Sequence, residues 1–362
     1  MRILTVCYEF PPVGGGGARV AHGLARQFVR EGHHVHFLSL GYGTLPVQES
    51  VDGIRLRRVT GWRARADITR PHELASYLWQ AREPLRKLLK TQHFDLVHLH
   101  FLFPDGLLAL LVPELCRYPL VATVHGSDVP GFNPDRFMVL HRLLRPLWQR
   151  VVRRMDRIVC PSQFIASLLL QHAPLAQPVV IPNGIDPRAE LSTNRRPELR
   201  LLTVSRLLER KGVQDLINAL PLMRGAQSVH IVGSGPYQQQ LEKLAAPLGE
   251  RVRFLGWLDS GSAELQGLYE TSEIFVFCSR SENFPVVLLE AMAAGLAIVA
   301  SDIPSCREVL GEAAVFVRPG DLAALAAALD GLASDVERRS QLQHAARQRL
   351  DENFRWPITA RR

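Results

Sequence analysis

The sequence contains few cysteines, and they form no motif. The five cysteines stand far apart, without any Cys-x-x-Cys pair, at Cys7, Cys116, Cys160, Cys278 and Cys306. This spacing disfavours a zinc site and a disulfide framework, and it favours reduced thiols in a cytosol. No apolar stretch reaches the roughly 18–20 residues that a membrane-spanning helix needs. The opening "MRILTVCYEF" lacks the features of a signal peptide and is interpreted as a first strand. We therefore expect a cytoplasmic protein.

Two other patterns are incomplete. The glycine run at 14–17 begins like a dinucleotide-binding loop, but Ala-Arg-Val follows where Gly-x-Gly-x-x-Gly needs its last glycine. A dehydrogenase is therefore disfavoured. His34 and His36, like His98 and His100, have the spacing of paired metal ligands, yet no obvious Asp, Glu or Cys partner accompanies them. We predict no metal site.

Positive charge is concentrated in the first half of the chain. The net charge of the 362 residues is +8, and residues 1–182 carry 22 Lys or Arg against 13 Asp or Glu, whereas the remainder carries 21 against 22. A basic half indicates an anionic partner, which could be nucleic acid, lipid headgroups or a phosphorylated small molecule. Composition alone does not choose among them.

Apolar segments of strand length alternate with helical patterns along both halves. "RILTVCY", "HVHFLSL" and "FDLVHLH" belong to the first half, and "LRLLTVS", "SVHIVGSG" and "EIFVFCS" to the second. This order predicts an α/β fold with two Rossmann-like, doubly wound parallel-sheet domains that face a central cleft, with ligands beyond the carboxyl ends of the strands. Pro, Gly and charged residues interrupt the pattern near 182–198. We expect domains at 1–182 and 199–340, a linker at 183–198, and a C-terminal helix at 341–362 that packs toward the first domain.

The segment "SENFPVVLLEAMAAG" (281–295) places two glutamates around a short apolar helix. Pro285 suits a first helical turn, so the helix is expected at about 284–294. Glu282 then precedes the helix, and Glu290 lies inside it with its side chain directed back toward the amino end. Both carboxylates could face one space, at a helix N-terminus that favours phosphate. A nucleotide sugar would suit this site. The alternative is a capping acid at Glu282 and a solvated Glu290.

Cations and glycines follow other predicted strands. "VSRLLERKG" offers Arg206 and Lys211, a planar fork and a point charge that suit a diphosphate. "IVGSGP" places Gly233 after the next strand, where a glycine lets the backbone approach a ligand closely. In the first half, "PPVGGGGAR" supplies the small residues Gly15, Gly16 and Gly17 between a strand and a helix.

Taken together, these segments resemble one family. "PPVGGGG", "HGSD", "PNGID", "SRLLERKG", "VGSGP" and "ENFPVVLLEAMAAG" follow the order and separations of the retaining glycosyltransferases of family 4, which have the GT-B fold. The resemblance covers nearly the whole chain. The stretch "HLHFLFPDG" leading to "TVHGSD" is further similar to members that build bacterial exopolysaccharides and cell-wall polymers such as teichuronic acid.

The resemblance implies roles for individual residues. Glu282 and Glu290 match the Glu-x7-Glu pair of the family, with Glu290 on the ribose and Glu282 facing the donor sugar. Arg206 and Lys211 match the diphosphate-binding pair. His125 matches the histidine that reaches the donor sugar near the reacting carbon.

Backbone groups would complete this donor site. The resemblance implies that the amides of Phe284 and Val286, with the glycines at 15–17, line the sugar and the phosphate. Pro285 stands where many members have glycine. Because proline has no N–H, at least one sugar contact must come from a neighbour.

The resemblance also implies the reaction. A UDP- or GDP-sugar would donate a hexose-type sugar to a polysaccharide or lipid-linked sugar acceptor, with retention and without a cofactor or metal. The leaving phosphate oxygen would take the acceptor proton while Arg206, Lys211 and the helix dipole stabilise its charge. The Asp-x-Asp pair that a metal-dependent transferase would use is absent from the sequence. The first domain would bind the acceptor and the second the donor, and the two would close over the linker.

Two alternatives are a nucleotide-sugar hydrolase or epimerase of the same fold, and a non-catalytic nucleotide-sugar-binding subunit of a polysaccharide synthesis complex. Product analysis without acceptor separates the first from a transferase. The five residues Glu282, Glu290, Arg206, Lys211 and His125 argue against the second, because a pure binder does not need all of them.

The arginine-rich stretch 135–156 has two interpretations. An ordinary helix with a core face and a solvated basic face accounts for its apolar residues. Attachment to anionic lipid at the inner face of the membrane is the functional alternative, although Pro146 is expected to interrupt the helix. No nucleic-acid-binding module accompanies the stretch, so we do not expect a nucleic-acid partner.

Overall fold

The computed structural model describes the chain except residues 67–68, 133, 187–198, 226 and 260, and it describes no side chains at 134–141. The chain forms two compact units. The first comprises Met1–Gly184 and Trp356–Arg362, and the second comprises Ile185–Arg355. The expected linker at 183–198 lies largely outside the described residues.

The first unit is built on an eight-stranded sheet with the order β3-β4-β2-β1-β5-β6-β7-β8. Its strands are β1 (Arg2–Val6), β2 (His34–Leu40), β3 (Gln48–Val51), β4 (Ile54–Val59), β5 (Leu96–His100), β6 (Leu120–Thr123), β7 (Arg157–Cys160) and β8 (Pro178–Val180). All neighbours pair in parallel except β3 and β4, which form an antiparallel edge. In the register of the centre, Ile3 pairs with Val35 and with Leu96.

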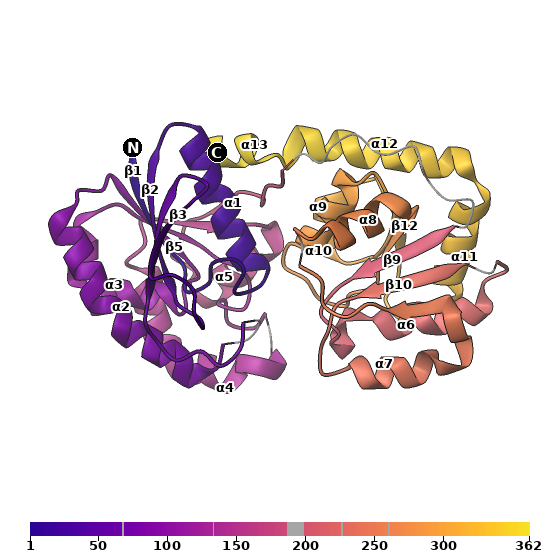
Figure 1. Ribbon diagram of the computed structural model, residues 1–362, viewed down its shortest axis with the longest axis horizontal. Helices are drawn as coiled ribbons and strands as arrows, with labels where there is room; N and C mark the ends of the chain where they lie inside the picture. Colours follow the sequence, from indigo (N-terminus) through magenta and orange to yellow (C-terminus); the bar gives the residue numbers. More distant parts are fainter. Residues whose placement is uncertain (67–68, 133, 187–198, 226, 260) are drawn as a thin grey trace. The chain divides into compact units, whose positions relative to one another are not determined.

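Alternation along β1 explains why this sheet is covered on both faces. Ile3 packs in a buried cluster with residues of α1 (Gly16–Arg30), whereas Leu4 packs in another with residues of α2 (Pro71–Thr91). Successive side chains of a strand point to opposite faces, so an almost continuously apolar strand serves both helices. Figure 1 shows α1 and α2 on the two sides of the strands.

The other helices of the first unit are α3 (Leu108–Leu111), α4 (Pro134–Val152), α5 (Gln163–His172) and α13 (Trp356–Arg361), with short 3₁₀ turns η1 (Asp105–Leu107) and η2 (Pro113–Arg117). The expected interruption at Pro146 is wrong, because α4 continues through it. One missing N–H weakens a helix locally but does not end it when the remaining turns are bonded. Part of the arginine-rich stretch lies at 134–141, where no side chain is described.

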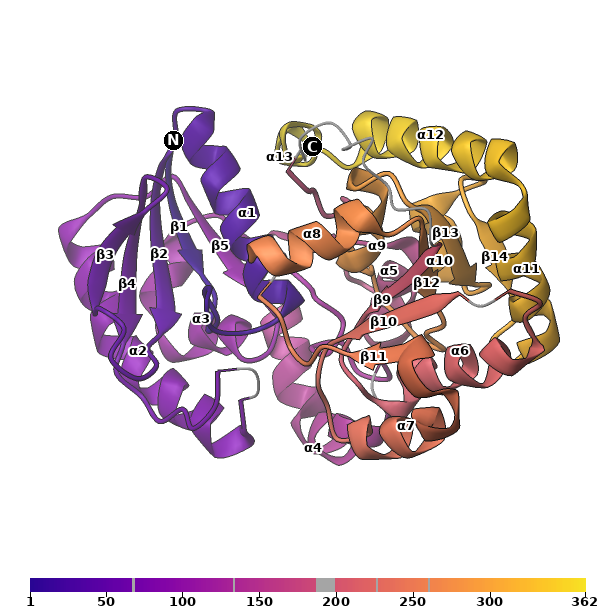
Figure 2. The same ribbon diagram turned by 45° about the vertical axis from the view of Figure 1, so that its right-hand side comes forward.

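The second unit contains a six-stranded parallel sheet with the order β11-β10-β9-β12-β13-β14 (Figure 2). Its strands are β9 (Arg200–Val204), β10 (Ser228–Val232), β11 (Val252–Phe254), β12 (Ile274–Phe277), β13 (Ala297–Ser301) and β14 (Val315–Val317). The prediction of two doubly wound parallel sheets is thereby confirmed. The strand order reverses between β9 and β12, which is where ligands of such sheets bind.

Helices cover both faces of this sheet as well. One buried cluster joins Phe275 to residues of α8 (Ala263–Thr271), α9 (Val286–Ala293) and α12 (Val336–Asn353). The other joins Ile274 to residues of α6 (Val213–Ala219), α7 (Gln238–Ala245) and α11 (Leu322–Ser334). The remaining helical segments are α10 (Pro304–Leu310), η3 (Glu209–Lys211), η4 (Leu220–Leu222) and η5 (Ala246–Arg251).

The end of the chain forms two helices where one was expected over 341–362. The helix α12 belongs to the second unit and ends at Asn353, and α13 belongs to the first unit, where it packs on α1. Gly23 of α1 makes this possible, because a Cβ there would lie 2.3 Å from the ring of Trp356. The hydroxyl of Thr359 also donates to the carbonyl of Pro182 at 3.1 Å. Trp356 and Thr359 together therefore anchor α13 to the first unit.

Candidate active site

The second unit places the predicted donor-site residues on loops that follow three adjacent strands. Arg206 and Lys211 lie between β9 and α6, Gly233 follows β10, and Glu282 lies between β12 and α9. The strands β10, β9 and β12 are parallel neighbours, so their carboxyl ends meet at one edge of the sheet. Arg206 is exposed at this edge.

Lys211 and Glu282 form an ion pair at this edge. The ammonium of Lys211 donates to Oε1 of Glu282, and the two side chains are 16% and 11% exposed. Because both groups are largely covered, solvent and salt screen the pair less than an exposed one. The sequence predicted both residues for the site, but it gave no indication that they contact each other.

Gly212 allows the two loops to approach. It ends η3 with φ of 68°, a left-handed conformation, and a Cβ there would lie 2.0 Å from the carbonyl oxygen of Cys278. Only glycine tolerates both conditions. Beside it, the backbone N–H of Arg280 donates to the carbonyl of Arg210 at 2.9 Å. The β9–α6 loop is thus fastened to the end of β12, which places Lys211 next to Glu282.

Glu290 has a different partner. It is 6% exposed on α9, and its Oε2 accepts a hydrogen bond of 2.9 Å from the hydroxyl of Tyr269 on α8. The alternative of a solvated Glu290 is therefore wrong, because the helix packs this carboxylate against α8. Tyr269 itself is fully buried, and nothing in the motif had pointed to it.

The helix that carries Glu290 starts later than expected. It spans Val286–Ala293, and Pro285 precedes it as the N-cap, with extended backbone, φ −74° and ψ 99°. The expected start near 284 is wrong because the residue before a proline is disfavoured in helical geometry. Phe284 is 7% exposed and packs its ring 5.8 Å from that of Phe354. Its side chain packs in the core, so only the backbone of Phe284 can contribute to the donor site.

The packing of its own loop requires glycine at position 233. Its φ is 132°, and a Cβ there would lie 1.8 Å from the carbonyl oxygen of Ser205. Its N–H donates to the carbonyl of Gly256 at 2.7 Å. The glycine was predicted to let the backbone approach a ligand, and here it lets the β10 loop approach the loop that carries Arg206.

In the first unit, the glycine run forms the junction of β1 and α1. Gly15 is the N-cap of α1, and a Cβ at Gly15 or Gly16 would meet open space. At Gly17, by contrast, a Cβ would lie 2.5 Å from the ring of Phe101 and 3.4 Å from that of His125. The first two glycines therefore leave room above the helix, and the third permits close packing beside His125.

A buried acid lies at the same helix N-terminus. Glu9 is 7% exposed, and its Oε2 accepts from the N–H of Gly15 at 3.3 Å while Oε1 accepts from Arg63 at 3.3 Å. Burial raises the pKa of Glu9, and the guanidinium of Arg63 opposes this shift. No sequence motif indicated this acid, which an anion bound at Gly15 would meet.

His125 lies just after β6, and Asp128 holds its backbone. Asp128 is 1% exposed, and its two carboxylate oxygens accept from the N–H of His125 at 2.9 Å and of Leu102 at 2.8 Å. Burial raises the pKa of Asp128 to about 6, although these N–H donors oppose it. The indole of Trp148 donates to the carbonyl of Asp128 at 2.9 Å. The "HGSD" motif thus contains the group that fixes the position of His125.

Two histidines of β5 lie next to His125. Nδ1 of His100 lies 3.1 Å from Nε2 of His125, and Nε2 of His98 lies 2.8 Å from the hydroxyl of Thr123. Burial lowers the pKa of His125 to about 3, that of His98 to about 4, and that of His100 well below its usual value. All three imidazoles are therefore neutral at physiological pH. The sequence showed this His-x-His pair only as a possible metal ligand.

The described part of the chain contains neither a cluster of metal ligands nor a membrane-spanning helix. No group of three or more His, Cys, Asp or Glu there has the geometry of a metal site. His36 contacts the ring of Phe94 edge-on at 5.4 Å. None of the described helices combines the length and the apolar composition needed to cross a membrane.

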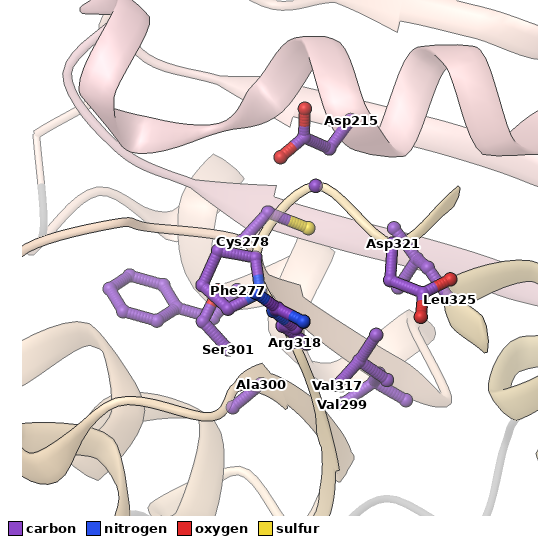
Figure 3. Close-up of a pocket in the computed structure, with 12 residues that line it drawn as sticks. Asp215, Phe277, Cys278, Val299, Ala300, Ser301, Val317, Arg318, Asp321 and Leu325 are labelled. Carbon is purple, nitrogen blue, oxygen red and sulfur yellow. The ribbon is translucent and has the colours of Figure 1, made fainter. Parts of the chain in front are cut away.

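A separate small pocket lies at the carboxyl ends of β12, β13 and β14. Figure 3 shows Asp215, Cys278, Arg318 and Asp321 among the residues around it. Asp215 is 6% exposed and accepts from Arg280 at 2.9 Å. The pocket contains neither Lys211 nor Glu282, so it is a neighbour of the predicted site and not part of it.

Comparisons with protein families support the sequence resemblance. Residues 14–189 match the model described as Glycosyltransferase Family 4, and residues 198–335 match the model described as Glycosyl transferases group 1. The chain is similar to a glycogen synthase of Mycobacterium tuberculosis, with 32% identity over 99% of this chain and 92% of the relative. It is also similar to a phosphatidyl-myo-inositol mannosyltransferase of that organism, with 34% identity over 70% and 67% of the two chains.

The fold is similar to that of a solved structure. HepE of Anabaena, crystallised with UDP-glucose, has a TM-score of 0.77 to this chain at 20% sequence identity, over 100% of this chain and 97% of HepE. At this level of identity, the likeness concerns the fold alone.

Proposed function

Because the chain belongs to the family 4 glycosyltransferases, has the GT-B fold and transfers sugar from a nucleotide sugar, we propose that its donor is a UDP- or GDP-hexose and its acceptor a polysaccharide or a lipid-linked sugar. We further propose that transfer retains the anomeric configuration and needs no metal. The observation that carries the proposal is the contact between Lys211 and Glu282 at the carboxyl edge of the second sheet.

This contact brings together the two kinds of group that a nucleotide sugar requires. A diphosphate needs cations, which Lys211 and the exposed Arg206 can supply, and sugar hydroxyls need acceptors, which Glu282 can supply. In the structure, Lys211 neutralises Glu282. When a diphosphate binds, it offers Lys211 a second anionic partner, and the carboxylate of Glu282 becomes available to the sugar.

The leaving group determines where positive charge is needed. As the bond between the sugar and the diphosphate breaks, negative charge grows on a phosphate oxygen, and fixed cations beside that oxygen lower the barrier. Lys211 and Arg206 take this role in our proposal. The same phosphate oxygen accepts the proton of the attacking hydroxyl, so no protein carboxylate has to act as base. Glu290, whose position Tyr269 fixes, is assigned to the ribose.

The first unit supplies His125 and the open glycines of the β1–α1 junction. We assign His125 to the donor sugar, and we assign acceptor binding to the unit that carries it. The relatives suggest two acceptor classes, since one is named a glycogen synthase and another a phosphatidyl-myo-inositol mannosyltransferase. A role in exopolysaccharide or teichuronic acid synthesis remains one form of this proposal.

The proposal is tested by measuring sugar transfer with a panel of nucleotide sugars, each offered with glucan and lipid-linked acceptors in EDTA. We expect one UDP- or GDP-hexose to give a glycosylated product with the anomeric configuration of the donor. Free sugar formed equally with and without acceptor would instead indicate a hydrolase. Transfer that occurs only after a divalent cation is added would contradict the metal-free mechanism.

A further inference from the structure

The imidazole of His125 contacts another imidazole, and this contact limits the positions of its proton. Nε2 of His125 lies 3.1 Å from Nδ1 of His100. Both rings are neutral, and a neutral imidazole carries one N–H and one bare nitrogen. A hydrogen bond between them therefore has two forms. Either His100 donates from Nδ1, or His125 donates from Nε2.

The far nitrogen of His100 separates these two forms. His100 is fully buried, and its Nε2 has no hydrogen-bond partner among the described residues. If His125 donated, His100 would have to carry its own proton on Nε2, as a buried N–H without an acceptor. If His100 donates, that nitrogen is only an unused lone pair. Orphaned buried donors are rarer in proteins than under-used acceptors, so the second form is favoured.

We propose that His100 is a positioning residue that donates Nδ1–H to Nε2 of His125 and thereby fixes His125 as the Nδ1–H tautomer. This inference rests on the proposed function, in which His125 touches the donor sugar. It adds the chemical identity of that contact: His125 offers an N–H donor to a sugar oxygen. From this nitrogen it cannot accept a proton, so the acceptor's proton must go elsewhere, to the leaving phosphate oxygen.

Neighbouring residues restrict the position of the His125 imidazole. The ring of Phe101 lies 4.3 Å from that of His125, and Phe101 has φ of 76°, a left-handed conformation that is rare for a bulky residue. Its N–H donates to the carbonyl of Thr123 at 2.9 Å, which ties the end of β5 to that of β6. With Asp128 holding the backbone, the imidazole is fixed through both its ring and its main chain.

Tautomers are read directly by nitrogen NMR of the whole protein labelled with ¹⁵N-histidine. A long-range ¹H–¹⁵N spectrum distinguishes protonated from bare ring nitrogens, and the His125→Gln variant identifies the signals of His125. We expect a protonated Nδ1 and a bare Nε2. A protonated Nε2, or a doubly protonated ring at neutral pH, would overturn the proposal. Because the spectrum needs no substrate, this result is independent of whether the proposed transfer is correct.

Variants test whether His100 sets the tautomer. His100→Leu should give His125 a mixture of tautomers and lower kcat by about tenfold, the effect of one lost hydrogen bond, with little change in KM for the donor. His98→Leu is the matched control, because it removes a buried imidazole from the same strand that does not contact Nε2 of His125, and it should keep the single tautomer. His100→Asn retains an N–H donor and should preserve the single Nδ1–H tautomer of His125. A pure Nδ1–H signal in His100→Leu would show that His100 does not set the tautomer.

Discussion

Lys211 and Glu282 stand 71 residues apart in the sequence, yet the amino group of one donates to the carboxylate of the other. The contact joins the loop after β9 to the loop after β12, on either side of the point where the strand order reverses. In our proposal, a cation and an acid held together at this position bind a ligand that carries both a diphosphate and hydroxyl groups.

Glu282→Gln and Glu282→Ala should lower the turnover of sugar transfer by roughly 100-fold or more, because the sugar loses its charged acceptor. The fold should be unchanged, since Glu282 lies on a loop. The measurement is kcat with the best donor and acceptor of the panel. Glu209→Gln changes an exposed acid in η3, near Lys211 in sequence, and should retain full turnover. Near-normal turnover of Glu282→Ala would refute the role given to this residue.

Gly212→Ala should destabilise the protein by about 2 kcal/mol or more, because the new methyl group meets the carbonyl of Cys278 in a left-handed backbone conformation. Urea unfolding of the variant measures the loss. Gly267→Ala is the comparison, since a Cβ there meets open space within α8, and it should be neutral or slightly stabilising. If the two variants were equally stable, the approach of the two loops would not depend on Gly212.

Asp128 should give the stability of the protein a dependence on pH between about 4 and 6. Burial raises its pKa from 3.8 to about 6 in the folded state, so the folded chain binds this proton more tightly than the unfolded chain. The contribution of Asp128 to the free energy of unfolding is then greatest below pH 4. It falls by something on the order of 3 kcal/mol as the pH rises to 6, and it is constant above.

The free energy of unfolding, measured at several pH values for the wild type and for Asp128→Asn, isolates this contribution. Asn cannot ionise, so the difference between the two proteins should change across this window. Above about pH 6, this difference should be constant. Parallel curves from pH 4 to 7 would mean that Asp128 titrates as an ordinary carboxyl group.

Removal of metal should leave the reaction intact. In our proposal, Lys211 and Arg206 supply the positive charge that a metal would otherwise bring to the diphosphate. Turnover should therefore be the same in EDTA as in buffer supplemented with Mg²⁺ or Mn²⁺. A loss of turnover in EDTA that either ion restores would be inconsistent with this role of the cations.

Much of the fold could be predicted from sequence, because buried parallel strands are apolar along their whole length and alternate with helices. The strands at the sheet edges were harder to predict. β3 (Gln48–Val51) and β8 (Pro178–Val180) are short and only partly covered, so they carry little apolar signal. The start of α9 was misplaced because Pro285 fits both the first turn and the cap.

The candidate site could be predicted as a set of residues, but its contacts could not. Motif order indicated Lys211, Glu282 and His125, since each follows a strand. Tyr269 lies in a segment that looks like ordinary core, and His100 stood out only as part of a possible metal-ligand pair. Only tertiary packing places them against Glu290 and His125. Pairings of this kind depend on distances that sequence spacing does not encode.

The most direct test of the account is the affinity for UDP and GDP, measured by titration calorimetry in EDTA with the wild type, Lys211→Met and Glu282→Gln. We expect Lys211→Met to lower the affinity for the more tightly bound of the two nucleotides by roughly tenfold or more, since it removes a charged partner of the diphosphate. Glu282→Gln should bind it at least as tightly as the wild type, because Lys211 no longer has a competing carboxylate. Lys243→Met, which changes an exposed cation on α7, should not alter the affinity. Equal affinities of Lys211→Met and the wild type would contradict the claim that this edge of the second sheet binds the diphosphate.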